Sequence, residues 1–527
     1  MFIRGDWFFV LLSLLTTAFM AKPYIYAMQQ DNYRLQCVFK SKTIRRIFLV
    51  DMMAMLIFIG IYIGVSYLHS RAFWGFLVAM FFFVAETVLY FAEDGDKKKP
   101  LKYTKRAVRG FGAIILTETA VITAILFHLS GIFDDDNAFF RYAGFLIIPV
   151  FYPLVLLLTM SVVNLFEGLN NRRYETKTKK ALEKSDTLKI AITGSYGKTS
   201  VKNFLKHILA VKYHVLATPE SYNTPMGISK TVKGLDLTHQ IFIAEMGARR
   251  VGDIKRLMKI VQPDISVLTG INSQHLETFK AQDNIIKEKL QVATMLQENG
   301  KVVINGNLKG LIEDFAPQIS AQIVYAGTAE DQVFASDILL TDDGCTFNLH
   351  FGDEVYSATT QLIGSHNVEN IAVASSVAYA LGIFPKHIVE RIATIEPVPH
   401  RLQLIQRDVI NIIDDTFNGN PDGARVALET LDCFKGRKVV ITPGLVELGD
   451  REKDENILLG ERIGKVADVV VLIGGKRSEQ LKHGLRDFQG EVLHFQTLKL
   501  AEQSFKDFIR IGDTILLLND LPDVYEE

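Results

Sequence analysis

A short glycine-containing segment, Thr193-Gly-Ser-Tyr-Gly-Lys-Thr-Ser200, has the residue types of a phosphate-binding loop. Gly194 and Gly197 would let the backbone approach phosphate oxygens, and N–H groups at the start of a following helix would hold the anion. Lys198 would reach the β- and γ-phosphates, and the Thr199 hydroxyl would bind Mg²⁺. Only two residues separate the glycines instead of the usual four, so the loop is a shortened version of the common pattern. Taken alone, this turn could also be a plain connection between a strand and a helix.

The elements around the loop must place it at the edge of a sheet. The segment 188–210 begins with a short apolar strand and ends in an amphipathic helix. The apolar face of that helix is predicted to contain Val201, Phe204, Leu205, Ile208 and Leu209. This strand–loop–helix context favours phosphate binding over a plain turn.

The shortened loop resembles that of the Mur ligases, which add amino acids or dipeptides to peptidoglycan precursors. The resemblance continues in order along residues 185–520. Pro219–Gly227, containing Asn223 and Thr224, is similar to the substrate-side loop of the branch that adds D-alanyl-D-alanine. Glu447, in Leu445-Val-Glu-Leu-Gly449, resembles a residue near the incoming amine.

The resemblance also assigns residues to metal and nucleotide. Glu245, in Ala-Glu-Met-Gly, matches a Mg²⁺ ligand; His275, which follows Asn272, matches a ligand of a second Mg²⁺. Lys289 falls where the family often carries a carbamylated lysine, and Arg401 matches an arginine that points toward the γ-phosphate. The remaining residues implied to contact ATP, besides Lys198, Thr199 and Arg401, are Gly194, Ser195, Gly197, Ser200, Asn305, Asn370, Asp415 and Asn418.

The chemistry implied by the resemblance explains these residue types. A carboxylate attacks the γ-phosphate of ATP to give an acyl phosphate, and an amine then displaces phosphate. Such transfer depends on positioning and on neutralising phosphoryl charge. Lys198, Arg401 and two Mg²⁺ ions would supply positive charge, whereas Thr199, Glu245 and His275 would hold metal. The catalytic set is therefore expected to be Lys198, Lys289, His275 and Arg401.

Other interpretations remain open at this point. Glu245 could be a buried core carboxylate, His275 a helix cap and Lys289 a solvated helix lysine. A second class of function is an ATP-driven membrane transporter, and a third is a scaffold that retains a nucleotide site. Folate polyglutamation enzymes share the loop, but the Ala-Glu-Met-Gly and Asn-Pro motifs favour peptidoglycan synthesis.

The first third of the chain predicts a membrane region. Five segments are long and apolar enough to span a bilayer: Ile3–Ala21, Met52–Ser70, Ala72–Ala92, Gly110–Phe133 and Tyr142–Phe166. A signal peptide is the competing interpretation of the first segment. The segments after the first, third and fifth helices are rich in Lys and Arg, whereas Asp134-Asp-Asp136 is acidic. Basic residues mark the cytoplasmic side, so a multi-pass membrane protein with cytoplasmic catalytic domains is expected. Glu86 and Glu118 lie within two of these segments and could be functional. The alternatives are a position near a helix end for Glu86 and a hydrogen bond to a neighbouring helix for Glu118.

Composition limits the other classes. The formal net charge of −1 gives no basic field for nucleic acid. The three cysteines, Cys37, Cys345 and Cys433, are far apart and suit buried positions in a reducing compartment. ATP, an amine, a carboxylate acceptor such as a muramoyl-peptide, and membrane lipid are the expected partners.

Three parts are predicted for the 527 residues. A helical transmembrane region covers 1–170, a central α/β domain with a mostly parallel sheet and the ATP loop covers 185–396, and a Rossmann-like α/β domain covers 397–527. The membrane region stands where Mur ligases usually carry a small domain for the UDP-sugar. Asn519-Asp520 also replaces the family's Lys-Gly-Ser stretch after the last strand. A lipid-linked or other membrane-proximal acceptor is therefore a hypothesis.

Overall fold

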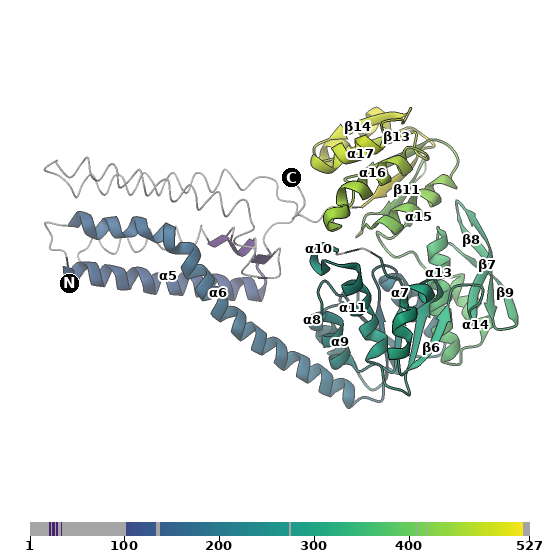
Figure 1. Ribbon diagram of the computed structural model, residues 1–527, viewed down its shortest axis with the longest axis horizontal. Helices are drawn as coiled ribbons and strands as arrows, with labels where there is room; N and C mark the ends of the chain where they lie inside the picture. The colour runs from purple at the N-terminus through teal and green to yellow at the C-terminus, as the bar shows by residue number, and fades with distance from the viewer. Residues whose placement is uncertain are drawn as a thin grey trace. The chain divides into compact units, whose positions relative to one another are not determined.

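The computed structural model describes residues 21–22, 24–26, 28–29, 33, 102–132, 138–272, 274, 276–407, 409–417 and 419–519 (Figure 1). The chain divides into two compact units, Met1–Arg172 and Arg173–Glu527.

Two long helices make up most of the described N-terminal unit. Helix α5 spans Lys105–Ile132, and α6 spans Ala138–Glu183 and continues into the second unit. Their apolar side chains, with those of residues around Tyr24, form a small buried cluster that includes Ile114, Leu156 and Met160. Arg109 pairs with Glu167 at 2.6 Å between the two helices.

The membrane prediction is tested only in part by these helices. Residues 110–132 of the predicted segment Gly110–Phe133 lie within α5, and Tyr142–Phe166 lies within α6. Phe133 and the other three predicted segments lie outside the described residues, apart from Ala21. Among the described residues, one helical segment of 30 residues, Leu154–Glu183, has the length of a membrane span and contains an 18-residue stretch with a mean hydropathy of 1.3. A single segment is weak evidence, so the five spans stay a prediction.

A nine-stranded sheet organises the first half of the second unit, called here the nine-stranded domain. Its strand order is β2-β3-β1-β4-β5-β6-β7-β8-β9. The strands from β2 to β7 pair in parallel, whereas β7-β8-β9 form an antiparallel meander. The strands are β1 Leu188–Thr193, β2 Val215–Ala217, β3 Ile241–Glu245, β4 Ile265–Leu268, β5 Lys301–Asn305, β6 Gln322–Ala326, β7 Val333–Thr341, β8 Gly344–Phe351 and β9 Glu354–Thr360.

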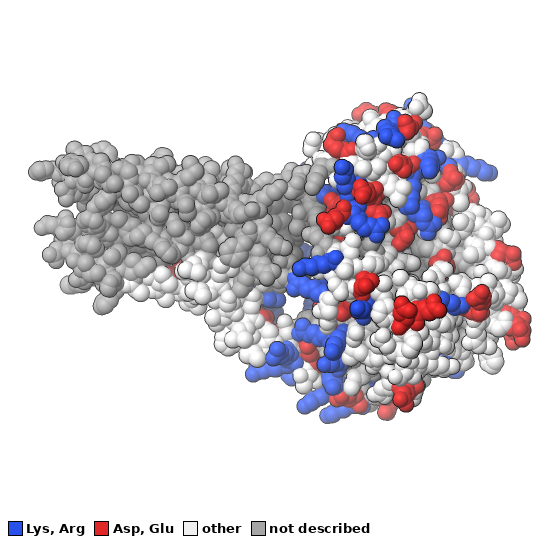
Figure 2. Space-filling model, viewed as in Figure 1, with Lys and Arg blue, Asp and Glu red and all other residues white. Residues whose placement is uncertain are grey.

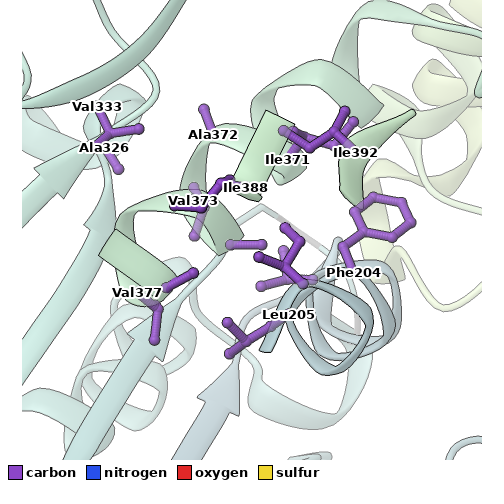
Figure 3. Close-up of a cluster of buried hydrophobic side chains, with 14 of the residues drawn as sticks. Phe204, Leu205, Ala326, Val333, Ile371, Ala372, Val373, Val377, Ile388 and Ile392 are labelled. Atoms are coloured by element: carbon purple, nitrogen blue, oxygen red, sulfur yellow. The ribbon is translucent and has the colours of Figure 1, made fainter. Parts of the chain in front are cut away.

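Helices cover both faces of the parallel strands. Because successive side chains of a strand point to opposite faces, Ile190 and Ile192 join one buried cluster while Ala191 joins the other. The first cluster includes α7 Lys198–Leu209, α13 Ser365–Ala380 and α14 Pro385–Ile392, as Figure 3 shows for Phe204, Leu205 and their neighbours. The second includes α8 Pro225–Val232, α9 Asp253–Val261 and α11 Gln282–Thr294. The shorter helices of this domain are α10 Leu276–Phe279, η2 Gly306–Leu308, α12 Lys309–Ile312 and η3 Glu313–Gln318.

The apolar face predicted for the helix after the phosphate loop is confirmed. All five predicted residues of α7 are buried in the first cluster. Burying this face fixes the helix against the sheet, so its N-terminus is held at the end of β1.

A second sheet of six strands forms the rest of the unit, called here the six-stranded domain. Its order is β10-β11-β15-β12-β13-β14, and only β10 runs antiparallel to its neighbour. The strands are β10 Gln403–Arg407, β11 Ile410–Asp415, β12 Lys438–Thr442, β13 Val469–Ile473, β14 Glu491–Phe495 and β15 Thr514–Leu518. The helices are α15 Pro421–Asp432, η4 Gly449–Arg451, α16 Glu452–Ile463, α17 Lys476–Gly484, α18 Leu498–Gln503 and α19 Phe505–Phe508. The predicted α/β architecture of both domains is confirmed, whereas the exact domain boundaries stay predictions.

The visible surface of the six-stranded domain mixes charges of both signs. Figure 2 shows Lys and Arg side chains interspersed with Asp and Glu there. No single sign of charge dominates the six-stranded domain in that view.

Candidate active site

The phosphate loop contains a glycine position where the backbone and its neighbours leave no room for a side chain. Gly197, the residue before α7, has a φ of 77°, a conformation that costs other residues roughly 1–2 kcal/mol. A Cβ there would lie 2.6 Å from Oδ1 of Asn370, on α13. The Lys198 ammonium donates to the carbonyl oxygens of Gly194 at 2.7 Å and Ser195 at 2.8 Å. The absence of a side chain at Gly197 therefore allows the loop to lie close to Asn370, another residue predicted to contact ATP.

Parallel strand pairing explains why distant residues converge on this loop. Strands β3 and β4 flank β1, and β5 follows β4, so the carboxyl ends of all four strands meet at one sheet edge. Glu245 ends β3 and Asn305 ends β5. The Asn305 amide donates to the backbone carbonyl of Thr269, just after β4, at 2.9 Å. The edge thus collects the predicted nucleotide and metal residues, as ligand sites in open α/β sheets do.

The Glu245 carboxylate is the most densely contacted group of the site. It accepts hydrogen bonds from the Thr199 hydroxyl at 3.0 Å, the Lys202 ammonium at 3.0 Å and the Asn223 amide at 3.1 Å. Burial alone would raise the pKa of Glu245, but the positive charges of Lys202 and Lys198 outweigh burial and hold that pKa below its usual value. Glu245 is therefore an ionised carboxylate that is buried from solvent.

This pair of oxygen groups fits a magnesium ion. The Thr199 Oγ1 and Glu245 Oε2 atoms lie 3.0 Å apart, close to the roughly 3 Å between neighbouring ligands of an octahedral ion with Mg–O distances of about 2.1 Å. Among the residues that the structure describes, no cluster of three or more His, Cys, Asp and Glu side chains could hold a metal. An ion at Glu245 would take Thr199 and oxygens of a bound nucleotide as further ligands; His275, the predicted ligand of a second Mg²⁺, lies outside the described residues.

Arg401 enters this site from the chain segment that leads into the six-stranded domain. Its guanidinium donates to the Thr199 hydroxyl at 3.2 Å and lies 4.6 Å from the ring centroid of Phe417. Asp415 is close by: its carboxylate accepts from the Leu402 N–H at 3.1 Å, and burial raises its pKa to about 6. The structure thus brings Arg401, Asp415 and the phosphate loop together, as the resemblance implied.

A second contact between the domains runs through Asn272. Its amide donates to Asn420 Oδ1 at 2.7 Å and to Asp422 Oδ2 at 3.1 Å. Its backbone N–H donates to the Ser195 hydroxyl of the phosphate loop at 3.2 Å. Asn272 therefore connects the loop to the start of α15 in the six-stranded domain.

Lys289 lies on α11 and is buried, with 2% of its surface exposed. Burial lowers its pKa to about 8. The interpretation of Lys289 as a solvated helix lysine is therefore wrong. Burial and, to a smaller extent, the positive charge of Lys289 lower the pKa of Lys198 to about 7.

The other predicted residues divide between the site and local structure. Ser200 is buried in the first turn of α7. The Thr224 hydroxyl accepts from the Gly227 N–H and caps α8, so a substrate role for it stays a prediction. Glu447 has a positive φ of 65° and shortly precedes η4. His275 and Asn418 lie outside the described residues.

Two segments match models of one protein family. Residues 192–378 match the Mur ligase middle domain, and residues 400–519 match the Mur ligase glutamate ligase domain. The chain carries the middle and C-terminal domains of the Mur ligase family.

Named relatives agree with this Mur ligase assignment. The UDP-N-acetylmuramoyl-tripeptide--D-alanyl-D-alanine ligase of Bacillus subtilis (strain 168) is 26% identical over 64% of this chain and 73% of its own length. The enzyme of the same name from Mycobacterium bovis is 30% identical over 56% of this chain and 60% of its own. Part of each relative therefore has no counterpart in the alignment.

Solved structures show the same Mur ligase fold. MurF from Acinetobacter baumannii aligns with a TM-score of 0.61 and 27% identity, over 66% of this chain and 77% of its own. MurF from Thermotoga maritima in complex with ADP aligns with a TM-score of 0.62 and 24% identity, over 67% of this chain and 81% of its own. The second likeness concerns the fold alone.

One group of this Mur ligase site was missed in the sequence. Lys202 is 1% exposed and contacts Glu245 directly. It lies four residues after Lys198, and residues at that spacing share one face of a helix. That spacing was the available signal, but a lysine next to an apolar stripe ordinarily indicates a solvated face.

Proposed function

We propose that this chain is an ATP-dependent ligase that joins a carboxylate to an amine in the synthesis of peptidoglycan precursors. A carboxylate oxygen of the acceptor attacks the γ-phosphorus, and the bond to the ADP oxygen breaks. The amine nitrogen then attacks the acyl carbon, phosphate leaves and the amine proton passes to solvent. The products are an amide, ADP and phosphate.

The convergence of Lys198, Thr199, Glu245 and Arg401 is the observation that carries this proposal. Lys198 and Arg401 would neutralise charge on the transferring phosphoryl group. Thr199 and Glu245 would hold Mg²⁺, which supplies further charge neutralisation when bound. Arg401 comes from outside the nine-stranded domain, so the full set of charges exists only while the two domains are in contact.

The acceptor and amine are proposed from the relatives. Those compared are named as ligases of UDP-N-acetylmuramoyl-tripeptide and D-alanyl-D-alanine. Asn223 ties the candidate acceptor loop to Glu245, which supports an acceptor carboxylate beside the metal. We propose a muramoyl-peptide acceptor and a D-alanyl-D-alanine amine.

The test is a reconstitution of the full chain in detergent with ATP, Mg²⁺, UDP-muramoyl-tripeptide and D-alanyl-D-alanine. Phosphate release that requires both acceptor and amine, with the amide detected by mass spectrometry, would support the ligase. Phosphate release that ignores the amine but follows a transported solute would favour a transporter instead. Arg401→Ala should abolish product, whereas the exposed Arg486→Ala should leave turnover unchanged.

We also propose that the N-terminal region anchors the ligase in the cell membrane, with the catalytic domains in the cytoplasm. Large apolar side chains on α6 are solvent-exposed in the structure, including Leu158 at 61%, Leu165 at 64% and Phe166 at 65%. Exposed apolar surface of this kind is favourable against lipid. Retention of the chain in membranes after alkaline extraction, with digestion of the C-terminal half in inverted vesicles, is the expected result.

A membrane anchor would suit a lipid-linked acceptor. The reconstituted chain should turn over a lipid-linked muramoyl-peptide faster than the soluble UDP-linked form. Equal or faster turnover of the soluble form would reject the lipid-linked acceptor without affecting the ligase assignment.

A further inference from the structure

Lys202 and Glu245 form a buried ion pair inside the candidate metal site. The ammonium lies 3.0 Å from the carboxylate, and each side chain is only 1% exposed. Removing two charges from water is costly, and an apolar pair of similar volume is often no less stable. A stability role alone therefore does not account for this lysine.

Lys202 also holds the candidate acceptor loop. Its ammonium donates to the backbone carbonyl of Glu220, a non-glycine residue with a positive φ of 43°. Three residues later, Asn223 donates to the other oxygen of Glu245. The lysine, the loop and the carboxylate thus form one connected unit.

The charges around Glu245 add up to a positive site before nucleotide arrives. Lys198, Lys202 and Arg401 each interact electrostatically with the Glu245 carboxylate, and a second carboxylate, Asp415, interacts with Arg401, so three cationic side chains face two carboxylates. This positive charge would repel a divalent cation that binds without nucleotide, and it would attract the phosphates of a nucleotide.

We propose that Lys202 is a positioning residue that serves as the internal counter-ion of Glu245 and makes metal binding depend on nucleotide. Its ammonium neutralises the carboxylate and keeps it aligned without metal. Phosphate oxygens then bring the additional negative charge that lets the ion bind. Lys202 acts through Glu245 and touches neither the metal nor the substrate. The inference rests on the proposed function only in taking Glu245 as a metal ligand.

The test measures metal binding without turnover. The full chain in detergent is titrated with Mn²⁺, a paramagnetic substitute for Mg²⁺, and free Mn²⁺ is followed by electron paramagnetic resonance with and without ADP. Wild type and Lys202→Arg should bind the ion at this site only with ADP. Lys202→Met should bind Mn²⁺ without nucleotide at least tenfold more tightly than wild type. Lys259→Met, at an exposed position of α9 and not among the charges that act on Lys202 or Glu245, should match wild type.

A double variant assigns the gained binding to Glu245. Lys202→Met combined with Glu245→Gln should lose the added Mn²⁺ affinity. Without metal, Lys202→Met should have a lower melting temperature than wild type. MgCl₂ without nucleotide should restore that melting temperature, because the ion replaces the lost ammonium. The melting temperature of the double variant should not change with MgCl₂. This thermal comparison remains decisive if Lys202→Met folds poorly without metal.

Two results would overturn the proposal. One is equal Mn²⁺ affinity of Lys202→Met and wild type without ADP. The other is an increase that persists in the double variant. Failure of the ligase assay alone would instead reject the proposed function, because the Mn²⁺ titration uses neither acceptor nor amine.

Discussion

The contact of Asn272 with the six-stranded domain should set how readily the two domains come together. Asn272→Asp keeps the shape and the oxygen that accepts from the Gln274 N–H, but it removes the donor to Asn420 and Asp422. A neutral hydrogen bond contributes about 1 kcal/mol and one to a charged group about 1.5–3 kcal/mol. The loss is about 3 kcal/mol before repulsion between two carboxylates is added, so the equilibrium constant for contact between the two domains should fall about 100-fold.

Spin labels on the two domains would measure this change. Cys433 is exposed in the six-stranded domain, so the buried position expected for it from the sequence is wrong. A second cysteine can replace the exposed Lys386 in the other domain, with Cys37 changed to Ser. Burial raises the pKa of the Cys345 thiol to about 11, so that thiol should resist labelling at neutral pH. With ADP present, Asn272→Asp should show a longer and broader distance distribution than wild type.

A matched control separates this effect from general damage. Asn284→Asp removes a similar amide donor to the Phe279 carbonyl, but within the nine-stranded domain, and should leave the distance unchanged. An Asn272→Asp distribution identical to that of wild type would refute the assigned role of this contact.

Three further changes test the loop, its helix and Lys289. Gly197→Ala should raise the dissociation constant of ADP tenfold or more, measured by calorimetry, because the φ of 77° and the nearby Asn370 oxygen both oppose a side chain. Phe204→Ala should lower the free energy of unfolding by about 3–5 kcal/mol in urea titrations, since the ring is buried and truncation leaves a cavity; Phe384→Ala, on an exposed ring, should cost under about 0.5 kcal/mol. Lys289, with a pKa of about 8, should form a carbamate with ¹³C-bicarbonate near pH 8–9, because only the neutral amine reacts. The carbon resonance should disappear as the pH falls below about 6, where the amine is protonated, and a signal unchanged in Lys289→Met would contradict the assignment.

The local features of the fold were predictable from the sequence. The buried face of α7 follows from helical periodicity, and the α/β class predicted for the C-terminal domain agrees with its alternating strands and helices. These elements depend on neighbours close in the chain. The antiparallel strands β8 and β9 were not predicted, because their pairing on the edge of the sheet is a tertiary property.

The site was predictable where one short segment carries the chemistry. The phosphate loop and Glu245 stand in motifs, and the structure brings them together. The buried position of Lys202 and the contact of Arg401 with Phe417 were not predictable in this way. Both depend on side chains from separate elements meeting in space. The four-residue spacing from Lys198 places Lys202 on the same helix face, but the partner of neither side chain can be read from a single sequence.

The stacking of Arg401 on Phe417 has a consequence for nucleotide affinity. An arginine side chain that moves freely before binding loses about 2 kcal/mol of rotamer entropy when it becomes fixed. Here the guanidinium already lies on the ring and donates to Thr199, so much of that ordering occurs when the domains associate. This entropy loss then does not weaken the binding of ATP, because the arginine is already ordered when the nucleotide binds.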